Sequence, residues 1–409
     1  MLSKFYESRL RIQSLRKSPA LPQLESFAQA LWETGYKART ARRHLRAAEH
    51  IIYWTHSQGT PVPLNEKSLT RFERHLSRCH CPNYGHTDRR SLVRGARLFL
   101  TYLREARIIP KRSTKPTVHE PALLSAFCQW MRQQRGVCEV TLRSYRIYIR
   151  ELLQRMGEEP SRFHARRLRA FVLEKTHSWG TAKNCATVLR MFLRFLIADG
   201  RCAVGLDAAI PTVAHWRLAS LPRYLPPKDV ERLIASCDRG SAVGRRDRAI
   251  LLLLARLGLR AGDIANLRVR DIDWEGASIQ VFGKGRCHTR LPLSREVGEA
   301  IVAYLKNGRP QTSIDAVFIS SLAPHRPFAS GCAISDIVKR ALRRAGVVRP
   351  NRGAAHLLRH SLATSLLRQG TSLQDIAAIL RHRSIETTLI YAKVDTCSLR
   401  HIAQPWPEV

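Results

Sequence analysis

The chain is 409 residues long and carries 69 Lys and Arg against 32 Asp and Glu, which gives a formal net charge of +37 and a pI near 11.0. Because 44% of the residues are hydrophobic and the basic residues run through the whole chain, the composition excludes a disordered basic tail and predicts packed cores. Such a balance is typical of a protein that binds a polyanion, and the length suggests about two to four domains.

The first predicted element is a basic N-terminal arm at residues 1–19. This stretch has a single acidic residue, Glu7, and lacks the apolar core of a secretory signal. We expect the arm to contact nucleic acid or to be disordered. Ten scattered cysteines without a secretion signal also favour reduced thiols and a cytoplasmic protein.

The first half of the chain contains an internal repeat. Four short blocks recur in the same order, at residues 27–31, 40–44, 69–72 and 99–103 in the first copy and at 127–131, 141–145, 168–171 and 192–196 in the second. Recurrence in one order indicates a duplication.

Each copy has apolar residues at helical spacing with arginines between them. In the second copy, Leu142, Tyr145 and Ile149 lie on one helical face. The sequence therefore predicts two basic, all-helical bundles that bind nucleic acid, at residues 20–109 and 118–200.

Two linkers are expected to separate the folded parts. Residues 110–117 contain Pro, Lys and Arg, and residues 201–220 precede a Pro-bearing stretch at 221–227 where the pattern changes. Beyond this point we expect a third domain at 221–409.

Residues 75–86 lie where the first copy is longer than the second. They contain His75, Cys79, Cys81 and His86, all of which are possible zinc ligands. Cys-x-Cys is not the usual spacing of a zinc knuckle, and the alternative is a basic loop with free thiols. We therefore predict no metal and no cofactor for the chain, while the role of this segment stays open.

Helical patterns begin the third domain, at residues 230–236 and 247–257. The second of them contains the longest apolar run of the chain, residues 249–255, which is far shorter than the roughly 20 residues needed to cross a bilayer. We expect a buried helix there and no membrane contact.

A β-hairpin then interrupts the helices. Residues 277–282 alternate with period two, a Gly-Lys-Gly turn follows, and residues 288–293 form the returning strand. The predicted fold class is therefore α+β, mainly α with a small β-hairpin or sheet. Lys284 at the turn does not belong to a Walker phosphate loop, because Ile279 and Gly285 stand where that motif needs Gly and Ser or Thr.

Two motifs present basic side chains. In Gly258-Leu-Arg260-Ala-Gly, the glycines let the backbone turn and expose Arg260, although an ordinary helix end has the same pattern. Further on, His356, Arg359 and His360 lie at i, i+3 and i+4 on one helical face. A permanent cation between two histidines fits an anion better than a metal.

The last motif contains a histidine and a tyrosine. Gly370 ends the helix of the previous motif, Ser372 begins another, and Ser384 can cap a short helix that carries Tyr391. On a continuous helix, His382 and Tyr391 would be about 13 Å apart. They can meet at one phosphate only because the chain turns between them.

Together these motifs resemble the tyrosine recombinase family, the phage-integrase-like DNA strand-transfer enzymes. The resemblance rests on the Gly-Leu-Arg box with its acid at Asp263, the His-x-Leu-Arg-His box at 356–360, the Leu-Arg-His box ending at His382, and a tyrosine nine residues beyond it. It covers residues 221–409, and the helical repeats resemble the core-binding domains of that family.

The resemblance implies six catalytic residues, Arg260, Lys284, His356, Arg359, His382 and Tyr391. The two arginines would bind the phosphate, Tyr391 would attack it, and His356 would act as acid and base. Lys284 would protonate the leaving 5′ oxygen, and His382 would hydrogen-bond the phosphate. We expect only supporting roles for Asp263 and His360, and we expect the nearby cations to lower the pKa of the tyrosine from about 10.

The implied function is that of a site-specific recombinase. It would break and rejoin double-stranded DNA through a 3′-phosphotyrosine intermediate, as in integration or transposition of a mobile element. The resemblance also implies a homo-tetramer on synapsed DNA, alone or with related recombinases. The alternatives are a catalytically silent DNA-binding relative and a DNA-relaxing enzyme like a type IB topoisomerase.

Overall fold

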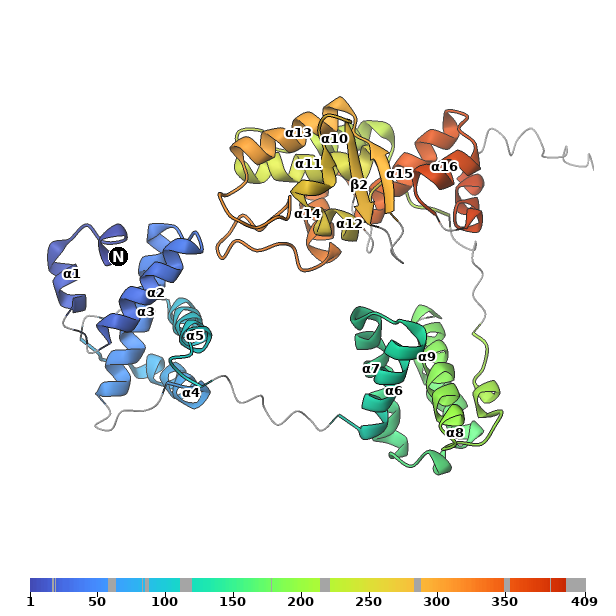
Figure 1. Cartoon of the computed structure of the whole chain (residues 1–409), viewed down its shortest axis with the longest axis horizontal. Helices are drawn as coiled ribbons and strands as arrows, with labels where there is room; N and C mark the ends of the chain where they lie inside the picture. The colour runs from blue at the N-terminus through green and yellow to red at the C-terminus, as the bar shows by residue number, and fades with distance from the viewer. Residues whose placement is uncertain are drawn as a thin grey trace, which may run out of the picture. The chain divides into compact units, whose positions relative to one another are not determined.

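The computed structural model describes residues 1–16, 18, 20–57, 64–82, 84, 88–110, 120–177, 179–213, 221–282, 288–348, 354–382 and 384–394. These residues are mainly helical, with one small antiparallel sheet (Figure 1). The chain divides into two compact units, residues 113–219 and residues 1–112 with 220–409. The buried apolar side chains form separate cores in the first bundle, the second bundle and the C-terminal domain.

The first bundle consists of α1 (Arg9–Arg16), α2 (Leu21–Glu33), α3 (Ala38–His56), α4 (Glu66–His75) and α5 (Arg89–Glu105), with 3-10 helices η1 (Leu2–Lys4) and η2 (Leu76–Arg78). Side chains fix where the helices begin: Asn65 accepts hydrogen bonds from the backbone N–H groups at the start of α4, and Asp88 does so for α5. Helix α3 packs along α5.

Residues 1–16 are folded, which differs from the expected arm. Leu2, Phe5 and Leu15 are buried in the core of the first bundle, and Arg11 donates a hydrogen bond of 3.2 Å to Glu49 of α3. The prediction of an arm rested on the basic residues of this stretch and did not consider its three apolar side chains, whose burial stabilises the folded form.

The second bundle consists of α6 (Ala122–Arg135), α7 (Glu139–Met156), α8 (Ala165–Leu173) and α9 (Trp179–Ala198), with η3 (Pro160–Arg162), η4 (Glu174–His177) and η5 (Leu206–Ala209). The repeated blocks lie on corresponding helices, α2 and α6, α3 and α7, α4 and α8, and α5 and α9. A core contact recurs too: ring centroids are 5.1 Å apart for Phe27 and Phe99, and 5.3 Å apart for Phe127 and Phe192. The prediction of two matching helical bundles is confirmed.

The C-terminal domain contains α10 (Pro227–Ala235), α11 (Ala242–Arg256), α12 (Ala261–Asn266), α13 (Arg295–Asn307), α14 (Gly331–Arg344), α15 (Ala354–Arg368) and α16 (Leu373–Ile379), with η6 (Val269–Asp271), η7 (Ile385–Thr387) and η8 (Leu389–Val394). The apolar run 249–255 of α11 is buried, as the sequence predicts, and α11 packs against α13 and α15. Among the described residues, no helix has both the length and the apolar character that a membrane crossing requires.

The sheet has three antiparallel strands in the order β1 (Ile272–Asp273), β2 (Ser278–Phe282) and β3 (His288–Pro292). Ile279 pairs with Leu291 and Phe282 with His288, which confirms the predicted hairpin. Strand β1 was not predicted, because two residues are too few to show a period.

Candidate active site

The Gly-Leu-Arg motif forms the turn between α11 and α12. Gly258 has a φ of +57°, and a Cβ there would lie 2.7 Å from Leu380 and 3.0 Å from Leu362. Glycine suits this position because the backbone is left-handed and two leucine side chains leave little room for a Cβ. The turn leaves Arg260 at the N-cap of α12, where its Nη2 donates to the backbone carbonyl of Arg381 at 3.0 Å.

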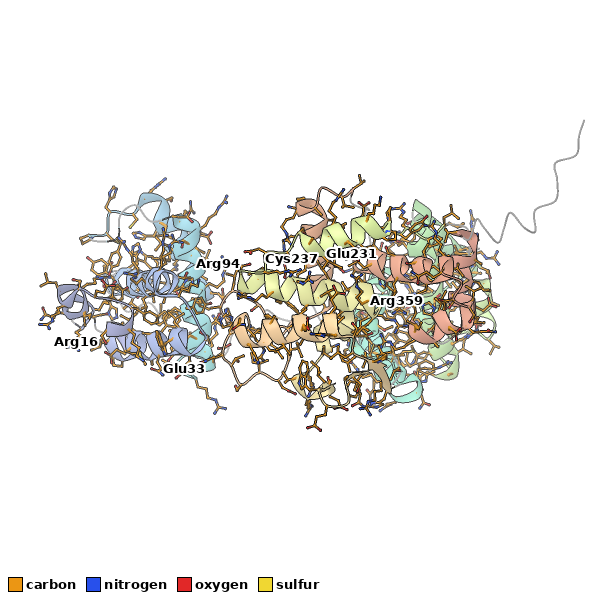
Figure 2. The ribbon with its side chains drawn as sticks, turned by 90° about the horizontal axis from the view of Figure 1, so that it is seen from above. Arg16, Glu33, Arg94, Glu231, Cys237 and Arg359 are labelled. Atoms are coloured by element: carbon orange, nitrogen blue, oxygen red, sulfur yellow. The ribbon has the colours of Figure 1, made fainter. Side chains whose placement is uncertain are left out.

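Arg359 connects three segments of the domain. It lies on α15 and is labelled in Figure 2. The residue is 4% exposed, and its side chain donates hydrogen bonds to the carbonyl oxygens of Gly258 and Leu380. Burial, followed by the nearby charge of Arg260, lowers the pKa of Arg359 to about 10, so the guanidinium stays charged at pH 7. Two guanidinium groups held close together favour an anion between them.

His356 lies one helical turn before Arg359 and is exposed. Desolvation of its ring, then the charges of Arg359 and Arg260, lowers the pKa of His356 from its usual 6.5. The imidazole is therefore neutral at pH 7, the form that can accept a proton.

Tyr391 lies on η8 with its hydroxyl against α15. The hydroxyl oxygen is 2.8 Å from Nδ1 of His360, and the tyrosine is 1% exposed. Burial raises the pKa of Tyr391 to about 12, and the charge of Arg359 opposes this shift. The charge of Arg359 acts in the direction expected of a nearby cation, but desolvation by burial outweighs it.

His382 follows α16 at the turn that the sequence predicts. Its Nδ1 lies 2.7 Å from Oγ1 of Thr388, and Ser384 caps η7 by accepting from the backbone N–H of Glu386. Burial lowers the pKa of His382 to about 4, and the charges of Arg359 and Arg260 act in the same direction. His382 therefore shares the surroundings of both arginines.

An ion pair that the sequence did not reveal supports this cluster. Arg381 and Asp263 form a contact of 2.6 Å, with side-chain exposures of 8% and 10%, and Asp263 also accepts from the backbone N–H of Arg260 at 3.2 Å. Nε and Nη1 of Arg381 are buried without a hydrogen-bond partner among the described residues. Arg381 is the arginine of the Leu-Arg-His box, but the pattern of that box does not indicate a pairing with Asp263, 118 residues away in the chain.

The structure brings five of the six expected residues into one region, through contacts that join α12, α15, α16 and η8. Lys284 lies outside the described residues, between β2 and β3. His360, assigned a supporting role from the sequence, is the imidazole that contacts the tyrosine hydroxyl. Its place in the His-x-Leu-Arg-His box was the available signal.

Arginines, neutral imidazoles and a tyrosine hydroxyl in one helical domain are groups that can bind a phosphate and transfer a proton. Residues 223–397 match the phage integrase family. The integrase/recombinase y4rA of Sinorhizobium fredii (strain NBRC 101917 / NGR234) is 36% identical over 393 residues, which cover 93% of both chains. The tyrosine recombinase XerD of Listeria monocytogenes serotype 4b (strain F2365) is 27% identical over 68% of this chain and 96% of its own. The chain belongs to the phage integrase family of tyrosine recombinases, enzymes that cleave and rejoin DNA strands in site-specific recombination.

Solved structures share the fold. The XerH site-specific recombinase bound to its palindromic difH substrate aligns with a TM-score of 0.54 and 19% identity, over 83% of this chain and 95% of its own. The Tn1549 transposon integrase in complex with transposon right end DNA aligns with a TM-score of 0.51 and 19% identity, over 68% of this chain and 99% of its own.

Proposed function

We propose that the chain recombines double-stranded DNA through a 3′-phosphotyrosine intermediate formed by Tyr391, in the integration or transposition of a mobile element. The observation that carries the proposal is the tyrosine hydroxyl 2.8 Å from His360, on the helix that also carries Arg359. The integrase/recombinase relatives and the transposon integrase among the solved structures support the biological setting.

In the proposed reaction, the tyrosine oxygen attacks a DNA phosphorus atom and the bond from phosphorus to the 5′ oxygen breaks. Arg260 and Arg359 hold the non-bridging oxygens as charge builds on them, and His382 adds a hydrogen bond. Lys284 protonates the leaving 5′ oxygen, and an imidazole takes the phenolic proton. His356 is the proposed acid and base, and His360 is the imidazole that contacts the hydroxyl, at 2.8 Å. The phosphodiester is exchanged rather than hydrolysed, so a second 5′ hydroxyl reverses the step without ATP.

The raised pKa of Tyr391 makes the proton acceptor essential. With a pKa of about 12, forming the free phenolate at pH 7 would cost about 7 kcal/mol. Removal of the proton during the attack avoids this cost, because the negative charge passes directly to phosphate oxygens that the arginines hold. Neutral imidazoles at His356 and His360 suit this task.

The proposed assembly is a homo-tetramer on two synapsed duplexes, alone or with related recombinases. Double-stranded DNA as the partner is supported by the net charge of +37 and by DNA-bound solved structures, among them a lambda integrase dimer bound to a COC′ core site. A silent DNA-binding relative and a DNA-relaxing enzyme are the competing functions.

The test is covalent capture of DNA by the full-length chain, followed by sequencing of the attached DNA and a cleavage assay on a nicked substrate of that sequence. Tyr391→Phe should bind the substrate as well as wild type yet form no adduct, because the ring remains and only the nucleophile is lost. Tyr304→Phe is the matched control, a tyrosine of the same domain that is likewise 1% exposed but lies in the core.

Each competing function predicts a different outcome. A silent relative would yield no adduct with the wild-type chain. An adduct of normal yield in Tyr391→Phe would remove this residue from the reaction. Relaxation of supercoiled DNA without strand exchange would identify the chain as a relaxing enzyme.

A further inference from the structure

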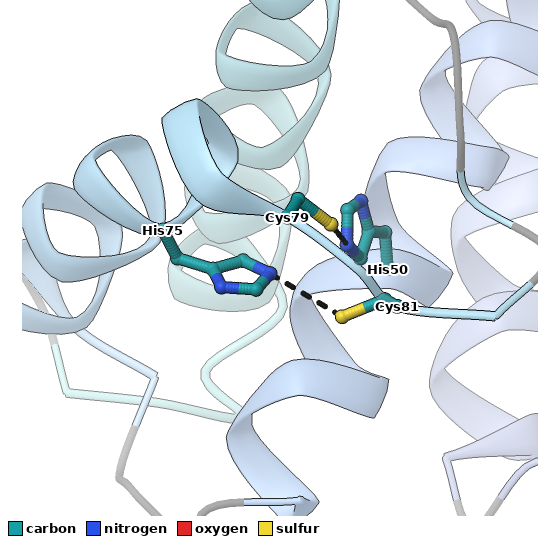
Figure 3. A group of neighbouring side chains, drawn as sticks. All are labelled: His50, His75, Cys79 and Cys81. Atoms are coloured by element: carbon teal, nitrogen blue, oxygen red, sulfur yellow. Dashed lines mark hydrogen bonds between the residues drawn. The ribbon is translucent and has the colours of Figure 1, made fainter.

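Four metal-ligating side chains converge in the first bundle, far from the residues of the recombinase site in sequence. In Figure 3, His50, His75, Cys79 and Cys81 point toward one another. Nε2 of His50 is 3.4 Å from Sγ of Cys79, and Nε2 of His75 is 3.3 Å from Sγ of Cys81. All four ligand atoms lie within 4.8 Å of one another.

These side chains come from three segments. His50 lies in the middle of α3, His75 ends α4, and the two cysteines follow η2 on the way to α5. Only His75, Cys79 and Cys81 belong to the set considered from the sequence. His86, its fourth member, lies outside the described residues, and the structure supplies His50 instead, 29 residues before Cys79.

The second bundle shows what the equivalent positions do. Alignment of blocks 40–44 and 141–145 places His50 opposite Glu151, and alignment of blocks 69–72 and 168–171 places His75 opposite Glu174. There, Arg155 pairs with both glutamates, at 2.9 Å from Glu151, and Lys175 lies 2.5 Å from Glu151. In the second bundle, the cation of Arg155 therefore connects Glu151 of α7 with Glu174 of η4.

The first bundle has imidazoles and thiols at this junction instead of carboxylates. Neutral imidazoles and thiols attract one another only weakly, so they do not replace the ion pairs by themselves. They are, however, the ligands that a borderline-soft divalent ion prefers. In the second bundle, Arg and Lys side chains provide the positive charge that joins these positions. In the first bundle, a metal ion held by nitrogen and sulfur ligands could provide it instead.

We propose that His50, His75, Cys79 and Cys81 bind one structural zinc ion. In a tetrahedral site with Zn–S of about 2.3 Å and Zn–N of about 2.0–2.1 Å, sulfur and nitrogen ligands are about 3.6 Å apart. The two sulfur–nitrogen distances, 3.4 and 3.3 Å, are close to that value. Four protein ligands leave no open position for catalysis, so the ion stabilises the fold.

Aromatic rings surround the two imidazoles and fix their planes. Tyr84 stacks on His50 with ring centroids 4.4 Å apart and an interplanar angle of 5°, and Trp54 stacks on His75 at 5.4 Å. Phe72 contacts both imidazoles, at 5.0 Å and 6.1 Å. Such packing holds ligand rings in place before the ion binds.

The position of the site suggests what the ion does for DNA binding. The segment it fastens leads into α5, whose arginines line a groove together with α3, at Arg43, Arg89, Arg90, Arg94 and Arg97. Zinc would fix the start of α5 relative to α3 and α4, and so hold these arginines at fixed spacing. The proposal does not depend on the recombinase function.

The test is the zinc content of the full-length chain, measured by inductively coupled plasma mass spectrometry after gel filtration in buffer without chelator. Wild type should carry one zinc per chain, and Cys79→Ser and Cys81→Ser should each lose most of it. The controls are His80→Gln, between the two ligand cysteines and exposed, and Cys138→Ser, an exposed cysteine of the second bundle. Both should keep the zinc.

Cobalt binding provides a measurement that does not depend on the variants folding. Cobalt added to the zinc-depleted wild-type chain should give the intense visible bands of a tetrahedral site and a thiolate charge-transfer band, and zinc should abolish both. Wild type without bound zinc that also gives no tetrahedral cobalt spectrum would overturn the proposal. A disulfide between Cys79 and Cys81 in the chain purified under reducing conditions would overturn it as well.

Discussion

Burial acts on both Arg359 and Tyr391, and in each it favours the neutral form. The pKa of Arg359 falls to about 10 and that of Tyr391 rises to about 12. Some donors of Arg359 are committed to the carbonyls of Gly258 and Leu380, and its remaining N–H groups are the ones available for a phosphate. The residue therefore has both a structural and a proposed catalytic role.

Substitution of either site arginine should separate these roles. Arg260→Ala and Arg359→Ala should each lower the cleavage rate by about 100-fold or more, since a donor to developing charge is typically worth about 3 kcal/mol. Arg359→Ala should also lower the melting temperature, because two buried carbonyls are left without their donor. Arg368→Ala, at the end of α15, is the control. Cleavage at the normal rate by either site variant would exclude that arginine from the reaction.

The histidines of the site predict how stability depends on pH. The pKa values of His360 and His382 are both lowered to about 4, first by burial and then by neighbouring groups that include Arg359. Between pH 6.5 and 4, the unfolded chain binds protons that the folded chain excludes. The free energy of unfolding should therefore fall as the pH falls through this window, and change little from these groups above it.

Thermal melting between pH 7.5 and 4.5 checks this expectation. The melting temperature of wild type should fall toward the acid end, and His382→Gln should show a shallower decrease than wild type. Parallel curves for the two proteins would show that His382 is not held neutral by the fold.

At the scale of helices and strands, the sequence predicted the features that depend on residues close together in the chain. The buried helix α11, the β-hairpin and the Ser384 cap follow from spacing within a few residues, and the repeat follows from short blocks that recur in the same order. The contacts that build the site do not. His360 with Tyr391 and Arg381 with Asp263 join residues 31 and 118 positions apart, and only the packing of α12, α15 and α16 brings them together.

The α11–α12 turn allows a test with two neighbouring glycines. Gly258→Ala should destabilise the domain by about 1–2 kcal/mol from the left-handed backbone alone, and by more because the added Cβ would lie 2.7 Å from Leu380. Gly262→Ala should be neutral or stabilising, because a Cβ there meets nothing within 4 Å and alanine favours the helix. Urea unfolding of both variants provides the comparison, and equal midpoints would contradict it.

At the scale of the whole chain, the duplicated bundles and the net charge of +37 suggest a long DNA contact. The proposed boundaries separate two bundles from the domain that carries the candidate site. A second bundle in tandem is expected to extend the contact along the duplex, because one bundle with the C-terminal domain already provides two surfaces for it.

Removal of residues 1–115 tests this expectation. The footprint should shorten, and the slope of log affinity against log salt should decrease by about 0.9 for each phosphate that the first bundle neutralises in the intact chain. Tyr391 should still form an adduct at low salt if the truncated chain keeps a cooperative melting transition. An unchanged footprint and slope would instead assign the first bundle to contacts with protein.

The burial of Tyr391 also bears on inhibition. A small electrophile would find the tyrosine 1% exposed, largely un-ionised at neutral pH and in contact with an imidazole. Reagents that acylate or nitrate accessible phenols should therefore modify other tyrosines first. A compound selective for Tyr391 would therefore have to reach a phenol that the fold covers, and could not rely on the reactivity of the hydroxyl alone.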